Sequence, residues 1–515
     1  MSSSETTVKM LIERTHPVRF NLPMTTEYAG QAFYIRDCYP EFYTAVLENF
    51  KRKIRYVSVT GTPGIGKSIF YLYFFHRFRA ENPERTIVTA SFRSNQKVKT
   101  CVVFKPHEKG IKYRGEIEYI DGAMYLFDGP PDMEPEGEEM VCFTSPNNDW
   151  FKSMKKFEIH TKMIMPPWDE VELLDANMQL GYIANPDAIS NRFAFFGGVA
   201  RFCLSRNEAF ISDAKNEIEC KIRLIDCCMK LEDCLNSNGT GPVAEILNHS
   251  VFHMIPASDS GETLGPRSFV YDFASLQIQE LLELNIDIYD DKELDIFVRR
   301  IKGEPSTAPL VGKLFEGACH RLLMKGGNFT AEPLSLSAKR FYMELPAGVY
   351  KRACRTNQAA VDGYWYDAIQ NRLLLFQMTI NYKHEIKVGG IRQILADLKL
   401  LDRIELLDEV FLIFLVAKGM ESFPVQDFDR SESLTLKSNV SLVNGIGPKV
   451  TQSLAKLGIL TVEQFLQNSR SDCRLERLGG YRKLCENQLN EPHHILDRII
   501  GIPQYRMDSS FDYKR

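Results

Sequence analysis

The chain has 515 residues, of which 44% are hydrophobic and 25% are charged, and its formal net charge is −4. This is the composition of a folded globular protein, and the length indicates three or four domains because one core stops growing at roughly 250–300 residues. The near-neutral charge excludes nucleic-acid binding through a global positive field, and the lack of an uncharged apolar run of the ~20 residues that span a bilayer predicts no membrane segment.

The beginning of the chain, MSSSETTVKML, lacks the charged-then-apolar layout of a signal peptide. The twelve cysteines are scattered and form no C-x-x-C pair, which argues against a zinc ribbon and for reduced thiols. We therefore expect an intracellular or nuclear protein.

Residues 1–50 are predicted to form an N-terminal leader with strand and short-helix character. A nucleotide-binding α/β domain is predicted over residues 51–210, where short apolar strands alternate irregularly with helices. Its expected strands are Ile54–Thr60, Thr86–Phe92, Cys101–Lys105, Met124–Asp128 and Met140–Thr144, with a further candidate at Lys156–Met163.

The most informative segment lies between the first of these strands and the expected helix Ile69–Arg79. It has the pattern glycine, four residues, glycine, lysine and serine, which is that of a phosphate-binding loop. In such a loop backbone N–H groups surround the β-phosphate, the lysine neutralises the β- and γ-phosphates, and the serine hydroxyl binds Mg²⁺. We therefore expect ATP or another nucleoside triphosphate, with Mg²⁺ or Mn²⁺, as cofactors. The predicted nucleotide contacts are Gly61, Thr62, Pro63, Gly64, Ile65, Gly66, Lys67 and Ser68.

Three further residues are candidates for this nucleotide site. Asp128 ends an apolar strand, from which its carboxylate would reach the Mg²⁺ beside Ser68. Asn147 follows the next strand and could contact the γ-phosphate, although its Pro-Asn context is equally typical of a plain turn. Arg201 follows two glycines at a helix start that resembles the one in AAA- and STAND-type ATPases. Such an arginine would sense the γ-phosphate from a helical lid, and a surface arginine is the alternative.

Residues 211–300 are predicted to be mostly helical and to form a lid or linker. Residues 301–424 predict a second α/β domain that begins with a long helix. Its other expected elements are strands at Arg340–Glu344, Leu373–Tyr382 and Glu409–Ala417 and a helix at Ile391–Leu400.

The second domain carries a candidate nuclease site. Glu316 on the helix, Asp362 before a hairpin and Gln377 on an apolar strand have the layout of the PD-(D/E)xK core, in which acids bind Mg²⁺ that activates water. Gln377 replaces the usual acid and Thr379 stands where lysine is expected, so Lys383 or His384 is the candidate for the missing cation. A β-hairpin with incidental polar residues is the alternative.

Residues 436–515 are predicted to form a small all-α module with a helix-hairpin-helix motif. Gly445 and Gly447 would let backbone N–H groups approach a DNA phosphate, with Lys449 beside them. A helical module that binds protein is the alternative.

These segments together resemble the Crinkler-type and retrotransposon-hot-spot proteins, in which a P-loop NTPase is joined to a restriction-endonuclease-like domain. The resemblance covers roughly residues 30–420. It implies that Gly61, Gly66, Lys67, Ser68 and Asp128 hold nucleotide and Mg²⁺ and that Glu316, Asp362 and Gln377 form the nuclease site, acting in the nucleus. The translocation header of the secreted Crinklers is not found in this sequence. The segments that carry the resemblance are YIRDCYPEFY, VTGTPGIGKSIFYLYFF, YLFDGPP, TSPNN, MPPWDEVEL, FGGVARF and FQMTINYKH.

The sequence thus predicts an NTP-regulated, Mg²⁺-dependent DNA endonuclease that grips DNA through its phosphate backbone, with oligomer formation open. The alternative is a nuclear scaffold in which a nucleotide switch controls a degraded nuclease core that binds DNA or protein without cleaving. A helicase-loader-like motor is a third hypothesis.

Overall fold

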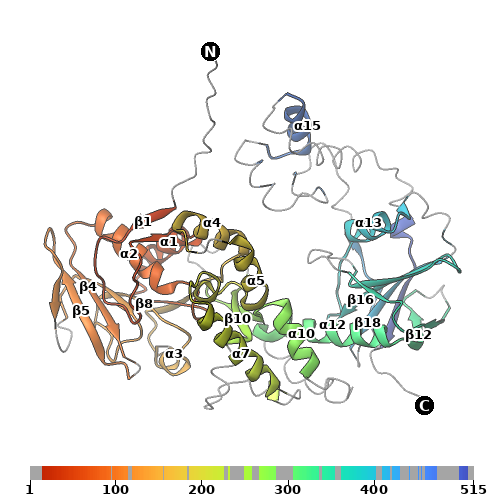
Figure 1. Ribbon diagram of the computed structural model, residues 1–515, viewed down its shortest axis with the longest axis horizontal. Coiled ribbons are helices and arrows are strands. Elements are labelled where there is room, and N and C mark those ends of the chain that lie inside the picture. The colour runs from red at the N-terminus through yellow and green to blue at the C-terminus, as the bar shows by residue number, and fades with distance from the viewer. Residues whose placement is uncertain are drawn as a thin grey trace. The chain divides into compact units, whose positions relative to one another are not determined.

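The computed structural model shows that the chain is mixed α/β with several sheets. The described part divides into two compact units, residues 14–285 with 305–311 and residues 312–508 (Figure 1). The structure describes residues 14–93, 95–113, 119–154, 156–182, 185–225, 230–231, 249–257, 266–285, 305–335, 339–353, 361–401, 407, 409–417, 420, 422–429, 440, 443, 451, 454, 459–471 and 498–508.

The first unit is built on a seven-stranded sheet with the order β6-β5-β4-β7-β8-β3-β9. The five strands from β4 to β9 in this order are parallel, and β5 and β6 extend the sheet as an antiparallel hairpin. The predicted strands are confirmed, because continuous β-branched and aromatic runs of this length suit a sheet buried on both faces. Their bounds are β3 Tyr56–Thr60, β4 Ile87–Phe92, β5 Val98–Phe104, β6 Ile111–Tyr113, β7 Met124–Asp128, β8 Glu139–Phe143 and β9 His160–Ile164.

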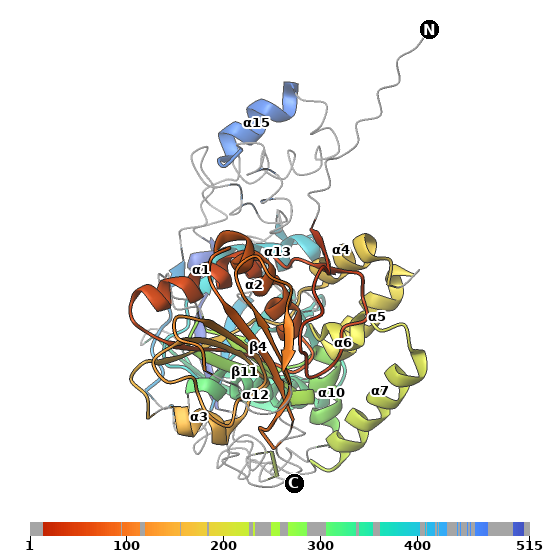
Figure 2. The same cartoon turned by 90° about the vertical axis from the view of Figure 1, so that its left-hand side faces the viewer.

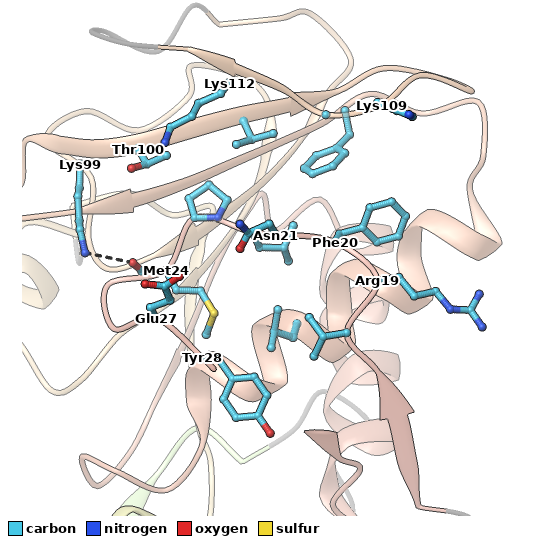
Figure 3. Close-up of a pocket in the computed structure, with 17 residues that line it drawn as sticks. Arg19, Phe20, Asn21, Met24, Glu27, Tyr28, Lys99, Thr100, Lys109 and Lys112 are labelled. Atoms are coloured by element: carbon cyan, nitrogen blue, oxygen red, sulfur yellow. Dashed lines mark hydrogen bonds between the residues drawn. The ribbon is translucent and has the colours of Figure 1, made fainter. Parts of the chain in front are cut away.

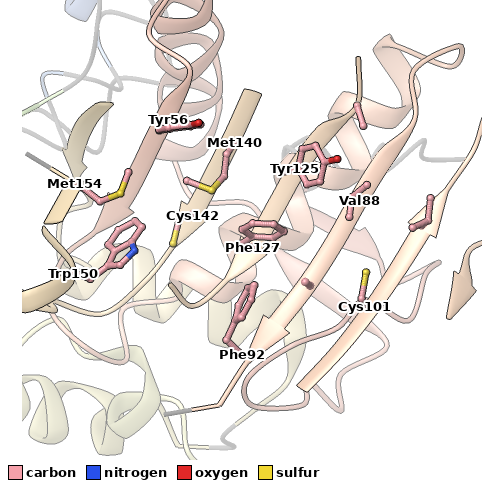
Figure 4. Packing of buried hydrophobic residues seen from close by; sticks show 13 residues of the cluster. Tyr56, Val88, Phe92, Cys101, Tyr125, Phe127, Met140, Cys142, Trp150 and Met154 are labelled. Atoms are coloured by element: carbon pink, nitrogen blue, oxygen red, sulfur yellow. The ribbon is translucent and has the colours of Figure 1, made fainter. Parts of the chain in front are cut away.

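Helices cover both faces of this sheet. Alternate residues of the strands face α3 (Asn148–Met154), whose Trp150 and Met154 complete an apolar cluster with Phe92, Tyr125 and Phe127 (Figure 4). On the other face lie α1 (Cys38–Lys51) and α2 (Lys67–Glu81), as Figure 2 shows. The rings of α2 residues pack there against Phe143. Because β3 and β7 both run parallel to β8, the loop before α2 and the loop after β7 leave the sheet at the same edge.

The leader forms a short hairpin of β1 (Thr15–Pro17) and β2 (Ala32–Tyr34). The chain joining these two strands, residues 18–31, approaches β5, where the Lys99 amine donates to the Thr25 carbonyl at 2.9 Å. After β9 come four helices, α4 (Glu170–Leu180), α5 (Pro186–Phe196), α6 (Ala200–Cys203) and α7 (Glu208–Arg223).

The prediction that residues 211–300 are mostly helical is wrong in part. After α7 the described chain forms an antiparallel hairpin of β10 (Phe252–Pro256) and β11 (Phe269–Phe273), followed by α10 (Leu276–Asn285). Five-residue apolar runs such as FHMIP are too short for periodicity to separate strand from helix. Pairing between the two runs decides in favour of strands.

The second unit contains another seven-stranded sheet, with the order β13-β12-β20-β18-β16-β15-β14. β16, β18 and β20 are parallel and the remaining pairs are antiparallel. The predicted strands near residues 340, 373 and 409 and the predicted helix near residue 391 are confirmed. The short helix η1 (Pro305–Thr307) belongs to the first unit, and α12 (Ala308–Lys325) runs from there into the second. The other bounds are β12 Gly327–Pro333, β13 Phe341–Leu345, β14 Lys351–Arg352, β15 Gly363–Asp367, β16 Arg372–Thr379, β17 Ile386–Lys387, α13 Val388–Asp397, β18 Glu409–Val416, β19 Phe428–Asp429 and β20 Gln504–Asp508.

The prediction of an all-α module over residues 436–515 is corrected at its C-terminal end. The helix α15 (Val462–Ser471) lies in this range, but β20 pairs with β18 and β12 inside the sheet of the second unit. Tyr505 and Met507 are buried there, so the strand is held by neighbours that are distant in sequence. None of the helices that the structure describes is both long and apolar enough to cross a membrane.

Candidate functional sites

A glycine-rich loop, residues 61–68, connects β3 to α2. Gly61, Gly64 and Gly66 have φ values of 144°, 85° and 95°, in the left-handed region that favours glycine. A Cβ on Gly61 would lie 2.6 Å from the Met165 carbonyl oxygen. Lys67 begins α2, and its buried amine donates hydrogen bonds of 2.9 Å to the carbonyls of Gly61 and Thr62. The loop therefore wraps around the lysine amine.

Neighbouring elements hold the loop from outside. The Trp168 indole donates to the Ile65 carbonyl at 2.7 Å, and the Tyr39 hydroxyl donates to the Gly66 carbonyl at 3.0 Å. The Thr62 hydroxyl accepts from the backbone N–H of Met254 on β10 at 3.0 Å. The hairpin that sequence reasoning missed thus supports the loop directly.

Asp128 at the end of β7 lies beside the start of α2. The Ser68 hydroxyl donates to Asp128 Oδ1 at 2.8 Å. The backbone N–H of Thr25, in the segment joining β1 to β2, donates to Oδ2, and the Thr25 hydroxyl donates to the Asp128 backbone oxygen at 2.8 Å. Burial raises the pKa of Asp128, against the opposing effect of these bonds and of the positive charge of Lys67. The structure therefore brings together Lys67, Ser68 and Asp128 as predicted from the sequence.

Arg201 also reaches the loop. Its backbone N–H donates to the Gly64 carbonyl at 3.1 Å, and its side chain lines the same cavity as Lys67. Burial and the nearby charge of Arg201 lower the pKa of Lys67 to about 7, against the attraction of Asp128. The preceding Gly198 lies so close to Trp168 that a Cβ would be 2.1 Å from its carbonyl oxygen. The Gly-Gly turn is thus what allows α6 to approach the loop.

Asn147 has a structural role in this conformation. Its Oδ1 accepts the backbone N–H of Trp150 at 3.0 Å and so caps α3. Ser145, two residues earlier, lines the cavity beside Lys67.

The cavity next to the loop has a volume of about 500 Å³. Beyond Lys67, Ser68 and Arg201 its walls come from α4, α6 and the leader. Tyr28 of the leader and Tyr182 after α4 share a hydrogen bond of 2.8 Å between their hydroxyls. Sequence reasoning missed Thr25 and Tyr28 because their bonds at this site join residues 103 and 154 positions apart in the chain.

A second polar site lies within the second unit, between α12, the start of β15 and the end of β16. The Gln377 amide and the Met378 backbone N–H donate to Asp362 Oδ2 at 2.8 and 2.6 Å. Burial and then the negative charge of Glu316 raise the pKa of Asp362 to about 7. Gln377 is 5% exposed, and its Oε1 has no hydrogen-bond partner among the described residues. The three predicted nuclease residues are therefore neighbours.

Three residues beyond the sequence prediction belong to this site. The ring of His320 contacts Glu316 Oε1 at 3.2 Å and the Tyr350 hydroxyl at 2.7 Å, and the Arg352 guanidinium lies 3.7 Å from Glu316. Burial would raise the pKa of Glu316, but the His320 bond and the Arg352 charge bring it below its ordinary value. The Glu316–His320 spacing of four residues on one helix is a signal that could have identified His320.

Thr379 ends β16, and Lys383 follows on the loop after it. The Thr379 hydroxyl is bonded to the backbone of Asn381, and Lys383 is exposed. Arg352 is the cation whose charge acts on both Glu316 and Asp362. The predicted DNA contacts Gly445, Gly447 and Lys449 lie outside the described residues.

The oxygen atoms at both sites suit a hard divalent cation. In the first site they are the Ser68 hydroxyl and the Asp128 carboxylate, and in the second the Glu316 and Asp362 carboxylates with the free Gln377 Oε1. No group of three His, Cys, Asp or Glu side chains among the described residues is arranged to hold a metal ion. An ion at either site therefore depends on neutral oxygens, bound water or phosphate for its remaining ligands.

Comparison of the chain with known proteins finds no matching family, no matching curated protein and no matching solved structure.

Proposed function

We propose that the first unit binds a nucleoside triphosphate with Mg²⁺, as a P-loop NTPase of the AAA or STAND kind. The observation that carries this proposal is the Lys67 amine enclosed by the loop carbonyls, beside the bonded Ser68–Asp128 pair. Phosphate oxygens would replace those carbonyls as partners of the amine, while the loop N–H groups surround the β-phosphate. Mg²⁺, when bound, would neutralise charge on the β- and γ-phosphates.

Arg201 and Asp128 would complete the nucleotide site. Arg201 lies on the cavity side of the loop, where its guanidinium can pair with a γ-phosphate. Asp128 would orient the metal or its water ligands through Oδ1, once Ser68 turns its hydroxyl to the ion. The attacking water in any hydrolysis has no assigned base, so we propose ATP binding as the primary activity and hydrolysis as its slow consequence.

The binding test uses Lys67→Ala. This variant should lose at least about 100-fold in ATP affinity, because it removes the cation that faces the phosphates. Lys105→Ala, an exposed lysine in the same unit, is the control and should bind as the wild type does. Unchanged ATP affinity in Lys67→Ala would refute the nucleotide site.

A second function, metal-dependent DNA cleavage, is supported by the orphaned Gln377 Oε1 next to Asp362. A buried amide oxygen without a partner is costly, and a bound cation would satisfy it. Glu316, Asp362 and Gln377 would hold Mg²⁺ or Mn²⁺, which would supply the acidity that activates water. Arg352 is placed to pair with the scissile phosphate in place of the lysine missing at position 379. The helix-hairpin-helix residues would hold the DNA backbone.

A plasmid-cleavage assay with Mg²⁺ and Mn²⁺, with and without ATP, distinguishes this endonuclease from a scaffold that binds DNA or protein without cleaving. Asp362→Ala should abolish nicking and retain ATP binding. Asp397→Ala, on the exposed end of α13, is the matched control and should cleave normally. Equal nicking by Asp362→Ala and the wild type would show that the activity arises elsewhere. Such a pairing of NTPase and nuclease would place the chain with the Crinkler-type proteins, acting in the nucleus.

A further inference from the structure

A second cavity, of about 650 Å³, shares part of its leader lining with the cavity beside Lys67. We call it the basic cavity. It is lined by leader residues 18–24, 27 and 28, by β5, by β6 and the loop before it, and by one residue of α2 (Figure 3). Met24, Glu27 and Tyr28 line both cavities. This short stretch of leader is therefore a wall shared by two sites.

The charge around the basic cavity is strongly positive although the whole chain has a net charge of −4. Arg19, Lys99, Lys109 and Lys112 line it, with Glu27 as its one carboxylate. Figure 3 shows Lys99 and Lys112 on one side and Arg19 and Lys109 on the other. Arg19, Lys109 and Lys112 are exposed and form no ion pair within the part of the chain that the structure describes. Their charges are available to a ligand.

The inner wall of the basic cavity is apolar. Phe20 and Phe104 line it with Leu22 and Val102, and the two aromatic rings meet edge to face with their centroids 5.9 Å apart. A pocket with an apolar wall and a few charged groups at its rim binds small organic ions, because the wall takes the body of the ligand and the charges fix its orientation. Ammonium and guanidinium groups pair well with phosphate oxygens.

We propose that the basic cavity is a second binding site, which takes a small molecule carrying phosphate on an apolar or aromatic body. The site is linked to the first through Lys99, whose amine donates to the Thr25 carbonyl at 2.9 Å. The N–H of the same Thr25 holds Asp128. A ligand phosphate that binds the Lys99 amine would break its bond to the Thr25 carbonyl, and Thr25 would then hold Asp128 less firmly. Occupancy of the basic cavity therefore changes the Mg²⁺-dependent affinity of the proposed nucleotide site.

Calorimetric titration of the full chain with inorganic tripolyphosphate, in the absence of metal, counts the sites. The wild type should bind two molecules, Lys67→Ala one, and Lys67→Ala with Lys109→Glu and Lys112→Glu none. Lys67→Ala with Lys105→Glu is the control for general charge, since Lys105 is exposed at the end of the same hairpin and does not line the cavity. This control should keep its one site. Thermal unfolding of each variant checks that the exposed substitutions leave the fold intact.

The apolar wall is tested with 1-naphthyl phosphate in the Lys67→Ala background. It should bind at least about tenfold more tightly than inorganic phosphate, because its ring is removed from water against Phe20 and Phe104. Equal affinities would overturn the assignment of the ligand class.

The outcomes separate this proposal from the nucleotide site. Loss of all tripolyphosphate binding in Lys67→Ala overturns the basic cavity and leaves the nucleotide site standing. Two further results would support the basic cavity and reject the nucleotide site. Lys67→Ala would bind as many tripolyphosphate molecules as the wild type, and the double variant Lys109→Glu/Lys112→Glu would bind one fewer. If the Lys105→Glu control also loses tripolyphosphate binding, the net charge of the protein and not the basic cavity determines binding. This result also overturns the proposal.

Discussion

At the scale of single residues, Lys67 of the glycine-rich loop has a pKa close to neutral pH. Its amine is buried and held by carbonyl oxygens, and burial with the charge of Arg201 lowers its pKa from 10.5 to about 7. In the nucleotide complex, phosphate oxygens would favour the charged amine and raise that pKa again. Occupancy of the site and protonation of Lys67 are therefore linked.

This linkage predicts proton uptake when ATP binds. At pH 8.5 the free protein holds Lys67 mostly neutral and the γ-phosphate is fully ionised, so binding should take up about one proton. Titration calorimetry in buffers with different ionisation enthalpies measures the uptake, and affinity should fall as pH rises above 7. A binding heat that is the same in every buffer at pH 8.5 would contradict the protonation of Lys67.

The ionised form of Asp362 lowers the stability of the folded protein. Its pKa is raised from 3.8 to about 7 by burial and by Glu316, so the folded state binds more protons than the unfolded state between these values. Stability is therefore lost as pH rises from about 4 to 7, and the cost then stays constant. A carboxylate kept at such a cost is characteristic of functional sites.

Asp362→Asn should consequently stabilise the protein. The asparagine oxygen can still accept from Gln377 and Met378, while the buried charge is removed. The gain should be near zero at pH 4 and at most about 4 kcal/mol above pH 7, because each pKa unit corresponds to about 1.4 kcal/mol. Urea unfolding at the two pH values measures it. A loss of stability at pH 8 would show that the carboxylate is held by favourable contacts instead.

At the scale of elements, the leader segment between β1 and β2 is the least expected part of the proposed nucleotide site. Thr25 bonds to Asp128 twice, through its N–H and its hydroxyl. Thr25→Val keeps the shape and the N–H but removes the hydroxyl bond, which is worth about 0.5–1.5 kcal/mol. We expect a several-fold loss in ATP affinity with Mg²⁺ and no loss in EDTA. An equal loss in both conditions would mean that Thr25 acts on the cavity and not on the carboxylate.

A structural feature could be predicted from the sequence where the residues that form it have a fixed spacing in the chain. The loop at residues 61–68, its flanking strand and helix, and the pairing of Glu316, Asp362 and Gln377 follow motifs whose parts have fixed spacing, and they could be predicted. Thr25 and Arg352 reach their sites only through the packing of distant segments. The same holds for β20, whose place beside β18 depends on pairing across about 90 residues. The basic cavity likewise joins the leader to β5.

At the scale of the whole molecule, the described chain contains two units, each with its own seven-stranded sheet and buried core. Units with separate cores unfold as separate cooperative transitions unless a large interface couples them. A ligand stabilises the unit to which it binds, by about 2.7 kcal/mol at 100 times its Kd. The two proposed activities can therefore be assigned to units without cutting the chain.

Scanning calorimetry of the full chain should show two transitions. ATP with Mg²⁺ at 100 times its Kd should raise one of them by roughly 5–10 °C, since about 2.7 kcal/mol is gained at 2–4 °C per kcal/mol, and Lys67→Ala should remove that shift. Asp362→Asn at pH 8 should raise the other transition and leave the ATP-sensitive one in place. If both perturbations move a single transition, the two units unfold together. ATP binding at the site around Lys67 would then also hold residues 312–508 folded, and a nucleotide would control the proposed nuclease site through stability itself.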